Sequence, residues 1–444
     1  MVQTTEQLTI SLEAVRQLST RNGEPEWLLK HRLEAWRLFE EAPMPDPLSE
    51  EWRRFETEAL TLDGLLPFAP ARAAIESASG LPAELRSLWD EREELAGRIV
   101  QHDSDVVYRQ LDPSLAKGGV VVTDLHSASR EHEALVREHL MSVVTAAEWK
   151  YLSLHGALWS GGAFVYVPAG VEVELPIEYA VGVSTPRLTS FPHLLIIAEP
   201  NSSVTVIQEG TSTNADGLSV ISGAVEVIAR EGARVRFVDV QRSGRNTQNF
   251  ATARARLEKD ASFEAILLGL GGALTRSRFD AVMAGDGSHV KFSGLFLGDA
   301  HQRFYYDTLQ EHIAPKTVSD LLFKAAMTDH ASIVWNGVVD LKKTASQAEA
   351  NQTSRNLLLS DTASASPTPI LEISAHDVSK CSHGATVGPV DREQLFYLQS
   401  RGISAEEAER MLMDGFFAEV LERVPSERLV RRVQAVLQRK REAS

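Results

Sequence analysis

The chain has 444 residues, a formal net charge of −16 and 43% hydrophobic residues. This length exceeds that of a typical single domain, and the composition is that of a globular protein with a substantial core. The acidic balance argues against nucleic acid or an anionic membrane as the main partner, because either would select a basic surface.

The chain contains one cysteine, Cys381, so an intramolecular disulfide framework is excluded and a reducing compartment is favoured. Its first residues lack the basic and apolar pattern of a secretory signal, and no apolar run reaches the length of a membrane span. We therefore expect a cytoplasmic protein.

Residues 1–155 are predicted to be mainly helical. A helix is expected to start near Pro25, because proline suits the first helical turn, and its buried face is marked by Leu29, Leu33, Trp36 and Phe39. Further helices are expected around 84–100 and 131–151. The short β-branched run at 120–125 predicts a strand.

Residues 156–375 have a different pattern, in which short β-branched runs alternate with turn residues. A weak repeat combines a turn, a small residue and an apolar–any–apolar triplet. The first apolar residue of the triplet occurs at Val171, Val204, Val235, Phe263, Val290 and Ile333. Successive positions are 33, 31, 28, 27 and 43 residues apart. A period near 30 residues predicts a stacked β-solenoid. A large antiparallel sandwich with similar turns is the alternative.

Residues 376–444 are predicted to be helical again. Asp391 with Gln394, and Ser404 with Glu407, resemble capping boxes, and Gly402 suits the end of the first of these helices. The last helix is amphipathic and basic. It is either a solvated terminal helix or a docking surface.

Several catalytic signatures are missing from the sequence. It has no Walker A phosphate loop, no GxSxG elbow, no HExxH and no CxxC. We therefore expect no enzymatic activity of the chain itself, and no cofactor bound to the chain alone.

One cluster of chemically reactive residue types follows directly after the solenoid. It contains His376, Asp377, Lys380, Cys381 and His383. Thiolate and imidazole are ligands for iron–sulfur clusters and zinc, and Lys380 with a nearby imidazolium would lower the pKa of the thiol. The alternative is a lone buried cysteine that acts as a small hydrophobic residue. One thiol and a few imidazoles cannot fill the usual four-cysteine set of a cluster, so a cluster here would need ligands from another chain.

Three segments resemble the SufB/SufD family of iron–sulfur cluster assembly scaffolds. The first runs from Gly23-Glu-Pro25-Glu-Trp27 to Ala42-Pro-Met-Pro45, and the second from Leu154-His155-Gly-Ala-Leu-Trp159 to Leu175-Pro176-Ile177. The third, which is the most specific, comprises Cys381-Ser-His383-Gly-Ala-Thr-Val-Gly, Gln394-Leu-Phe396-Tyr397, Ser400-Arg401-Gly402 and Gly415-Phe416. His155 departs from the asparagine expected in the second segment.

The resemblance implies a mainly β fold, with a right-handed parallel β-helix core flanked by helical regions. It also implies a complex of SufB, SufD and two copies of the ATPase SufC, with SufC docked on the C-terminal helices. In that complex Cys381 and His383 would lie at a SufB–SufD interface where a transient cluster is assembled and passed to acceptor proteins. Self-association of the isolated chain stays open.

The resemblance favours the SufD type. SufB-like chains usually have further cysteines in the core and an acidic residue where this chain has Gly384. A SufB-type scaffold that carries the nascent cluster is the alternative within the family. A polysaccharide-acting β-helix enzyme is the alternative from another class.

Overall fold

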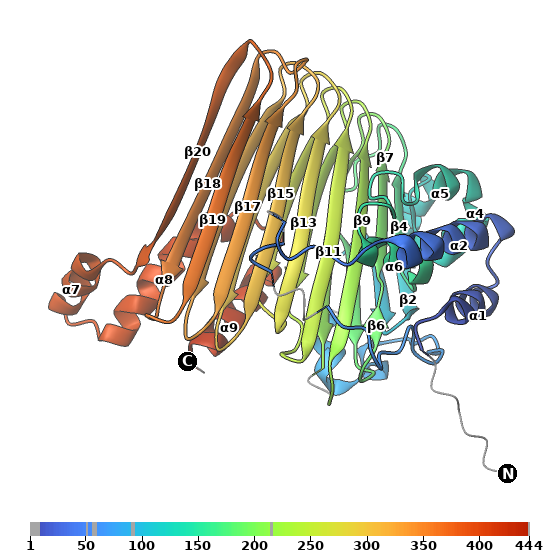
Figure 1. Ribbon diagram of the computed structural model, residues 1–444, viewed down its shortest axis with the longest axis horizontal. Coiled ribbons are helices and arrows are strands. Elements are labelled where there is room, and N and C mark those ends of the chain that lie inside the picture. Colours follow the sequence, from blue (N-terminus) through green and yellow to red (C-terminus); the bar gives the residue numbers. More distant parts are fainter. Residues whose placement is uncertain (1–8, 50–51, 56–59, 90–93, 214–215, 443–444) are drawn as a thin grey trace.

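The computed structural model describes residues 9–49, 52–55, 60–89, 94–213 and 216–442. A long stack of strands dominates the molecule, and helices lie at both ends of the stack (Figure 1). Each solenoid turn contributes one strand to each of two sheets, and we call such a pair of strands a rung. The predicted fold class, a mainly β protein with a parallel solenoid between helical terminal regions, is confirmed.

The first sheet has ten strands and runs the whole length of the solenoid. In spatial order these are β2 (Asp105–Leu111), β1 (Gly97–His102), β5 (Ile177–Val183), β8 (Ser203–Ser212), β10 (Arg234–Gln241), β12 (Ser262–Gly269), β14 (His289–Gly298), β16 (Val318–Met327), β18 (Ala348–Leu358) and β20 (Val378–Pro389). Apart from the antiparallel β1–β2 pair, neighbouring strands are parallel.

The second sheet faces the first across the core. In spatial order its strands are β3 (Val121–Asp124), β4 (Ala163–Val167), β7 (His193–Ala198), β9 (Ser219–Ala229), β11 (Thr247–Leu257), β13 (Leu274–Met283), β15 (Arg303–His312), β17 (Ser332–Leu341) and β19 (Ser364–Ile373), and β6 (Thr189–Ser190) also pairs with β9. Only the β3–β4 pair among the described strands of this sheet is antiparallel.

The predicted repeat corresponds to the rungs over most of its length. In four successive strands of the first sheet Val204, Val235, Phe263 and Val290 lie side by side in register. The last member of the repeat is wrong, because Ile333 lies in the second sheet and Ser319 is the residue beside Val290. The interval of 43 residues therefore reflects a change of sheet rather than a longer turn.

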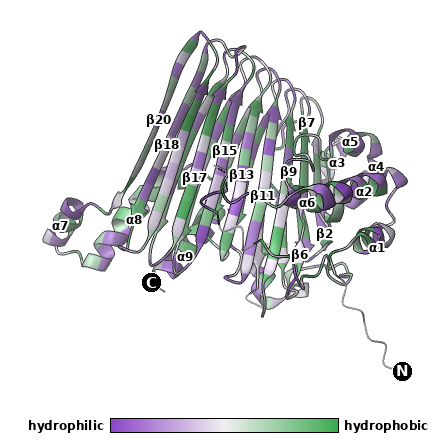
Figure 2. Cartoon of the chain, viewed as in Figure 1, coloured by the Kyte–Doolittle hydropathy of each residue, from purple (hydrophilic) through white to green (hydrophobic). Residues whose placement is uncertain are grey.

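Alternation along the strands creates the core between the two sheets. Figure 2 shows hydrophobic and hydrophilic residues alternating along many of the strands. One inward column consists of Val206, Phe237, Ala265, Phe292 and Leu321, all of them buried and paired in register. Stacking such columns buries a continuous apolar interior that no single rung could bury alone.

Helices and a hairpin cover the N-terminal end of the solenoid. They comprise α1 (Leu12–Asn22), α2 (Glu26–Glu41), α3 (Pro113–Lys117), α4 (Leu125–Glu131), α5 (Glu133–His139) and α6 (Lys150–Leu158), with the 3-10 helices η2 (Ala78–Gly80) and η3 (Ala83–Leu88). The helix predicted after Pro25 is confirmed as α2, and the strand predicted at 120–125 as β3.

Two predicted helices in this region are wrong in part. The one at 84–100 is the short η3 followed by β1, with residues 90–93 outside the described residues. The one at 131–151 is interrupted after α5, because the buried carboxylate of Glu226 accepts hydrogen bonds from the backbone N–H groups of Met141, Val143 and Val144. These tertiary contacts replace the hydrogen bonds that a continued helix would form.

The C-terminal helices are α7 (Arg392–Ser400), α8 (Ala405–Leu421) and α9 (Glu427–Glu442), as the capping residues predicted. Asp391 and Ser404 cap α7 and α8, and Gly402 has a positive φ of 87°. The sheets extend beyond the predicted core of 156–375, because β1 precedes it and β20 follows it. No helix in the described part of the chain is long and apolar enough to cross a membrane.

Candidate functional site

The cysteine–histidine cluster lies on the last strand of the first sheet. β20 lies beside β18 (Figure 1). The register of this pair places Cys381 beside Ala350 and His383 beside Gln352. Ala350 and Gln352 are both buried in the solenoid interior. Cys381 and His383 therefore share the inward-facing side of the strand, because side chains two residues apart on a strand point to the same face.

Together, β19 and β20 form an open end of the solenoid. Each is the terminal strand of its sheet, so its second edge has no neighbouring strand among the described elements. Ile373 and Val387 are 50% and 44% exposed at this end. Unpaired edges beside exposed apolar side chains are the features of a surface that another chain can cover.

Cys381 lies in apolar surroundings at the open end. It is partly buried and packs against the cluster that contains Val339, Leu341 and Ala350. Burial raises the pKa of the Cys381 thiol, because the apolar environment disfavours the thiolate. The predicted lowering of this pKa by Lys380 and a nearby imidazolium is wrong.

His383 has a different environment, since it is exposed and stands over polar side chains. Gln352, its neighbour on β18, is fully buried and donates a hydrogen bond from Nε2 to Oε1 of Gln310 at 2.9 Å. The thiol of Cys381 thus lies against apolar side chains, whereas the imidazole of His383 lies beside a polar side chain.

Of the other residues of the predicted cluster, Lys380 is on β20 but faces the side opposite to Cys381. His376 and Asp377 are in the exposed turn before β20, where the Asp377 carbonyl accepts a hydrogen bond from the Gln347 N–H at 2.6 Å. Across the described ranges no group of three or more His, Cys, Asp or Glu side chains could hold a metal ion. Among the described residues, the side chains at the open end that could ligate a cluster are Cys381 and His383. A cluster usually has four protein ligands, so two would be missing.

A second candidate surface lies on the C-terminal helices. None of the residues of α7 is buried, and Phe396 and Tyr397 are 73% and 57% exposed. Met411 on α8 is also exposed. The apolar side of α8 and α9, in the region where the resemblance places SufC, is buried because it packs on the outer face of the first sheet. The packed residues include Met413, Phe417, Val420, Leu429, Val433 and Leu437 from the helices, and Val238, Ile266, Leu295 and Leu322 from the strands.

His155, from the second family-like segment, is buried in the N-terminal region. Its Nδ1 lies 2.8 Å from the Ser222 carbonyl oxygen and its Nε2 lies 3.0 Å from Nδ1 of His193. Burial and the neighbouring His193 lower the pKa of His155 to about 3. The position is a neutral, hydrogen-bonded structural histidine.

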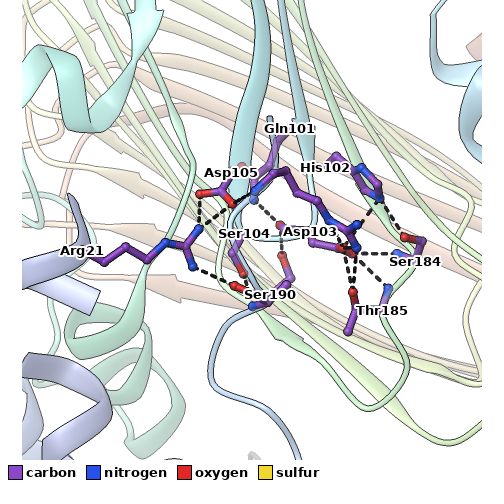
Figure 3. A network of polar contacts seen from close by, with 11 residues as sticks. Arg21, Gln101, His102, Asp103, Ser104, Asp105, Ser184, Thr185 and Ser190 are labelled. Carbon is purple, nitrogen blue, oxygen red and sulfur yellow. Dashed lines mark hydrogen bonds and ion pairs between the residues drawn. The ribbon is translucent and has the colours of Figure 1, made fainter. Parts of the chain in front are cut away.

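A polar network that sequence reasoning missed joins the N-terminal helices to the solenoid (Figure 3). Arg21 of α1 forms an ion pair with Asp105, and the buried Asp103 accepts hydrogen bonds from the backbone N–H groups of Ser184 and Thr185 at 2.8 and 3.1 Å. Burial opposes ionisation of Asp103, but these bonds and the ion pair with Arg72 hold its pKa below the usual range. The role of this polar network is structural, because its charged side chains pair with one another.

Comparisons with known proteins agree with this architecture. Residues 181–416 match the family model described as SUF system FeS cluster assembly, SufBD core domain, and residues 4–179 match that of the SufBD protein N-terminal region. The chain belongs to the SufBD family. An iron–sulfur cluster assembly SufBD family protein of Staphylococcus haemolyticus is 32% identical over 423 residues, which cover 93% of this chain and 89% of the relative. Relatives from Staphylococcus epidermidis and Staphylococcus aureus show 32% identity with the same coverage.

Proposed function

We propose that this SufBD family chain is a SufD-type scaffold, which acts with a SufB subunit and the ATPase SufC in cluster assembly and transfer. The open end is where SufB would meet it, and the cluster is cargo assembled across that interface. The single cysteine supports the SufD type, because the chain cannot supply a cluster's thiolates by itself.

The pairing of Cys381 and His383 on the inward side of the uncovered terminal strand carries this proposal. Both side chains face the space that a second solenoid would close, and they offer fewer donors than a cluster requires. Between the two, His383 is the better ligand, because neutral imidazole binds iron without first losing a proton. The raised pKa of Cys381 weakens the SufB-type alternative, in which this thiolate would carry the cluster.

Energy for the process would come from the partner ATPase. The sequence has no phosphate-binding loop that could cradle ATP. The polysaccharide-acting alternative is not proposed, because membership of the SufBD family gives it no support.

Three single variants in a strain that depends on the Suf system test the proposal. His383→Ala should lose most cluster assembly while the complex still forms, and Cys381→Ser should have a smaller or equal effect. His376→Ala is the matched control, since this exposed histidine lies outside the inward side of β20. Growth rate and iron content of the purified complex are the readouts. Full growth with His383→Ala would refute the cluster-site role.

A further inference from the structure

A buried amide side chain, Gln352, lies beside His383 and contacts a second buried amide, Gln310 of β15. Gln352 and Gln310 are both fully buried, and Nε2 of Gln352 donates to Oε1 of Gln310. The remaining polar atom of each amide, Oε1 of Gln352 and Nε2 of Gln310, has no hydrogen-bond partner among the residues that the structure describes. Buried polar atoms without partners are uncommon in folded proteins, and each one calls for an explanation.

The position of Gln352 suggests what its free oxygen does. Gln352 and His383 are in-register neighbours on adjacent parallel strands and face the same side. Adjacent strands are about 4.8 Å apart, which brings the imidazole within hydrogen-bond reach of the amide after a side-chain rotation. The next inward residue of the same column is Leu321, which offers no polar group.

The other inward amide of β18 already uses its N–H groups. Asn356, two positions along β18, donates to the carbonyl oxygen of Thr386 at 3.0 Å and to Oγ of Ser354 at 3.1 Å. Of these two inward amides of β18, Gln352, the register neighbour of His383, is the one with a buried polar atom that lacks a partner among the described residues.

We propose that Gln352 is a positioning residue for His383. Its Oε1 accepts a hydrogen bond from one imidazole N–H, which leaves the other ring nitrogen as an acceptor directed at a ligand. Gln310 holds the Gln352 amide in this orientation by accepting from its Nε2. A histidine that binds a metal commonly donates its other N–H to a carbonyl or carboxylate in this way, which sets the tautomer. The ligand in question is the cluster of the proposed function, but the tautomer itself does not depend on that function.

The tautomer of His383 can be measured in the full-length chain. Histidine labelled with nitrogen-15 reports which ring nitrogen carries the proton, at about pH 8 where free imidazole is neutral, and the His383→Ala variant assigns the signal. The wild type should show one dominant tautomer. Gln352→Leu should move His383 to the mixture of free imidazole, whereas Gln352→Glu, which keeps an acceptor oxygen, should retain the dominant form. Ser354→Ala, at the adjacent inward position of β18, should leave the tautomer of His383 unchanged.

A second variant protects the test against misfolding. Gln310→Met keeps the volume of the interior but frees the Gln352 amide, so it should weaken the preference for one tautomer. A free-imidazole mixture in the wild type, or a preference unchanged by both Gln352→Leu and Gln310→Met, would overturn the proposal. If His383→Ala supports normal cluster assembly while the tautomer responds as described, the proposed function fails and the positioning contact stands.

The functional consequence is tested in the assembled complex. Loss of such a contact typically costs about 10- to 100-fold in metal affinity. Gln352→Leu should therefore lower the iron content of the purified complex, and Gln352→Glu should restore most of it. Equal iron content in wild type and Gln352→Leu would contradict the positioning role.

Discussion

Asp239 shows how far a single residue in the solenoid can depart from its ordinary chemistry. It lies on β10 between Gln208 and Leu267 of the flanking strands, on the inward side of the sheet. Burial raises the pKa of its carboxyl group to about 7, and the hydrogen bond from Nε2 of Gln208 at 3.2 Å opposes this shift. The side chain is therefore protonated in the folded state over a pH range in which an unfolded aspartate is charged.

The raised pKa predicts a pH-dependent stability. Because the folded state binds a proton that the unfolded state releases, stability falls as the pH rises from about 4 to about 7. The substitution Asp239→Asn should remove this pH-dependent loss of stability. Its stability advantage over the wild type should grow by about 2–3 kcal/mol between pH 5 and pH 8, from about 1.4 kcal/mol per pKa unit. Urea denaturation at the two pH values checks it. Asp286→Asn, in an exposed turn, is the control, and an advantage that does not change with pH would contradict the expectation.

The sequence could show part of the site at this scale. Cys381 and His383 were identified as a pair, but their region, 376–444, was predicted to be helical, so the shared strand face follows from the structure. Gln352 could not be found, because it is 31 residues earlier in the sequence and only the strand register places it beside His383. The apolar environment of Cys381 matches the alternative of a cysteine that acts as a small hydrophobic residue, and the sequence left the choice open because its apolar neighbours come from other rungs.

At the scale of elements, the sequence predicted the helices whose capping residues lie within their own segment. It did not predict the helix ends and strands that depend on contacts with distant parts of the chain. Capping residues located α7 and α8, because each cap bonds its own helix. The break after α5 depends on Glu226, which is distant in sequence. The strand β1 was read as helix because its identity depends on pairing with β5. The open end was beyond sequence reasoning, which ended the solenoid before β20.

The packing of α8 and α9 on the solenoid leads to a stability prediction. Phe417 is 1% exposed and belongs to the cluster shared with the outer face of the first sheet. Phe417→Ala should destabilise the protein by about 3–5 kcal/mol, because it removes a large buried side chain and leaves a cavity. Thermal denaturation measures this, and Phe416→Ala, a partly buried neighbour, should cost less. Equal effects would show that the helix is not anchored through Phe417.

The same packing decides where SufC docking should be tested. Deleting everything after Ile403 would uncover the outer face of the first sheet, so loss of SufC binding would not identify the docking surface. The exposed aromatic pair of α7 is the better target. Phe396→Ser with Tyr397→Ser should reduce SufC co-purification at least tenfold, because interface aromatics often contribute 2 kcal/mol or more, about 30-fold in affinity. Leu48→Ser, at an exposed leucine elsewhere, is the control. Undiminished SufC recovery would place the docking surface outside α7.

At the scale of the whole molecule, the two ends of the solenoid differ. The antiparallel strands β2 and β3 and the N-terminal helices cover one end. At the other end, β19 and β20 have no further strand beside them among the described elements, and Ile373 and Val387 are exposed. Repeat proteins need a cap at each end to protect the interior. Under the proposed function a SufB subunit would cover the open end, and a second copy of this chain is the alternative occupant.

Lysine at the open end tests this dependence on a partner. Val387→Lys places a charge on the inward side of the terminal strand, where a docked solenoid would have to bury it without a counter-charge. The variant should fold normally, because Val387 is 44% exposed in the isolated chain, but it should lose association with the SufB subunit. Leu175→Lys is a matched control, since Leu175 is also 44% exposed and lies far along the solenoid from β20. Native mass spectrometry of co-expressed subunits gives the stoichiometry of both variants. A complex that forms equally well with Val387→Lys would show that the partner binds elsewhere. If the isolated wild-type chain forms dimers and Val387→Lys abolishes them, a second copy can occupy the same end.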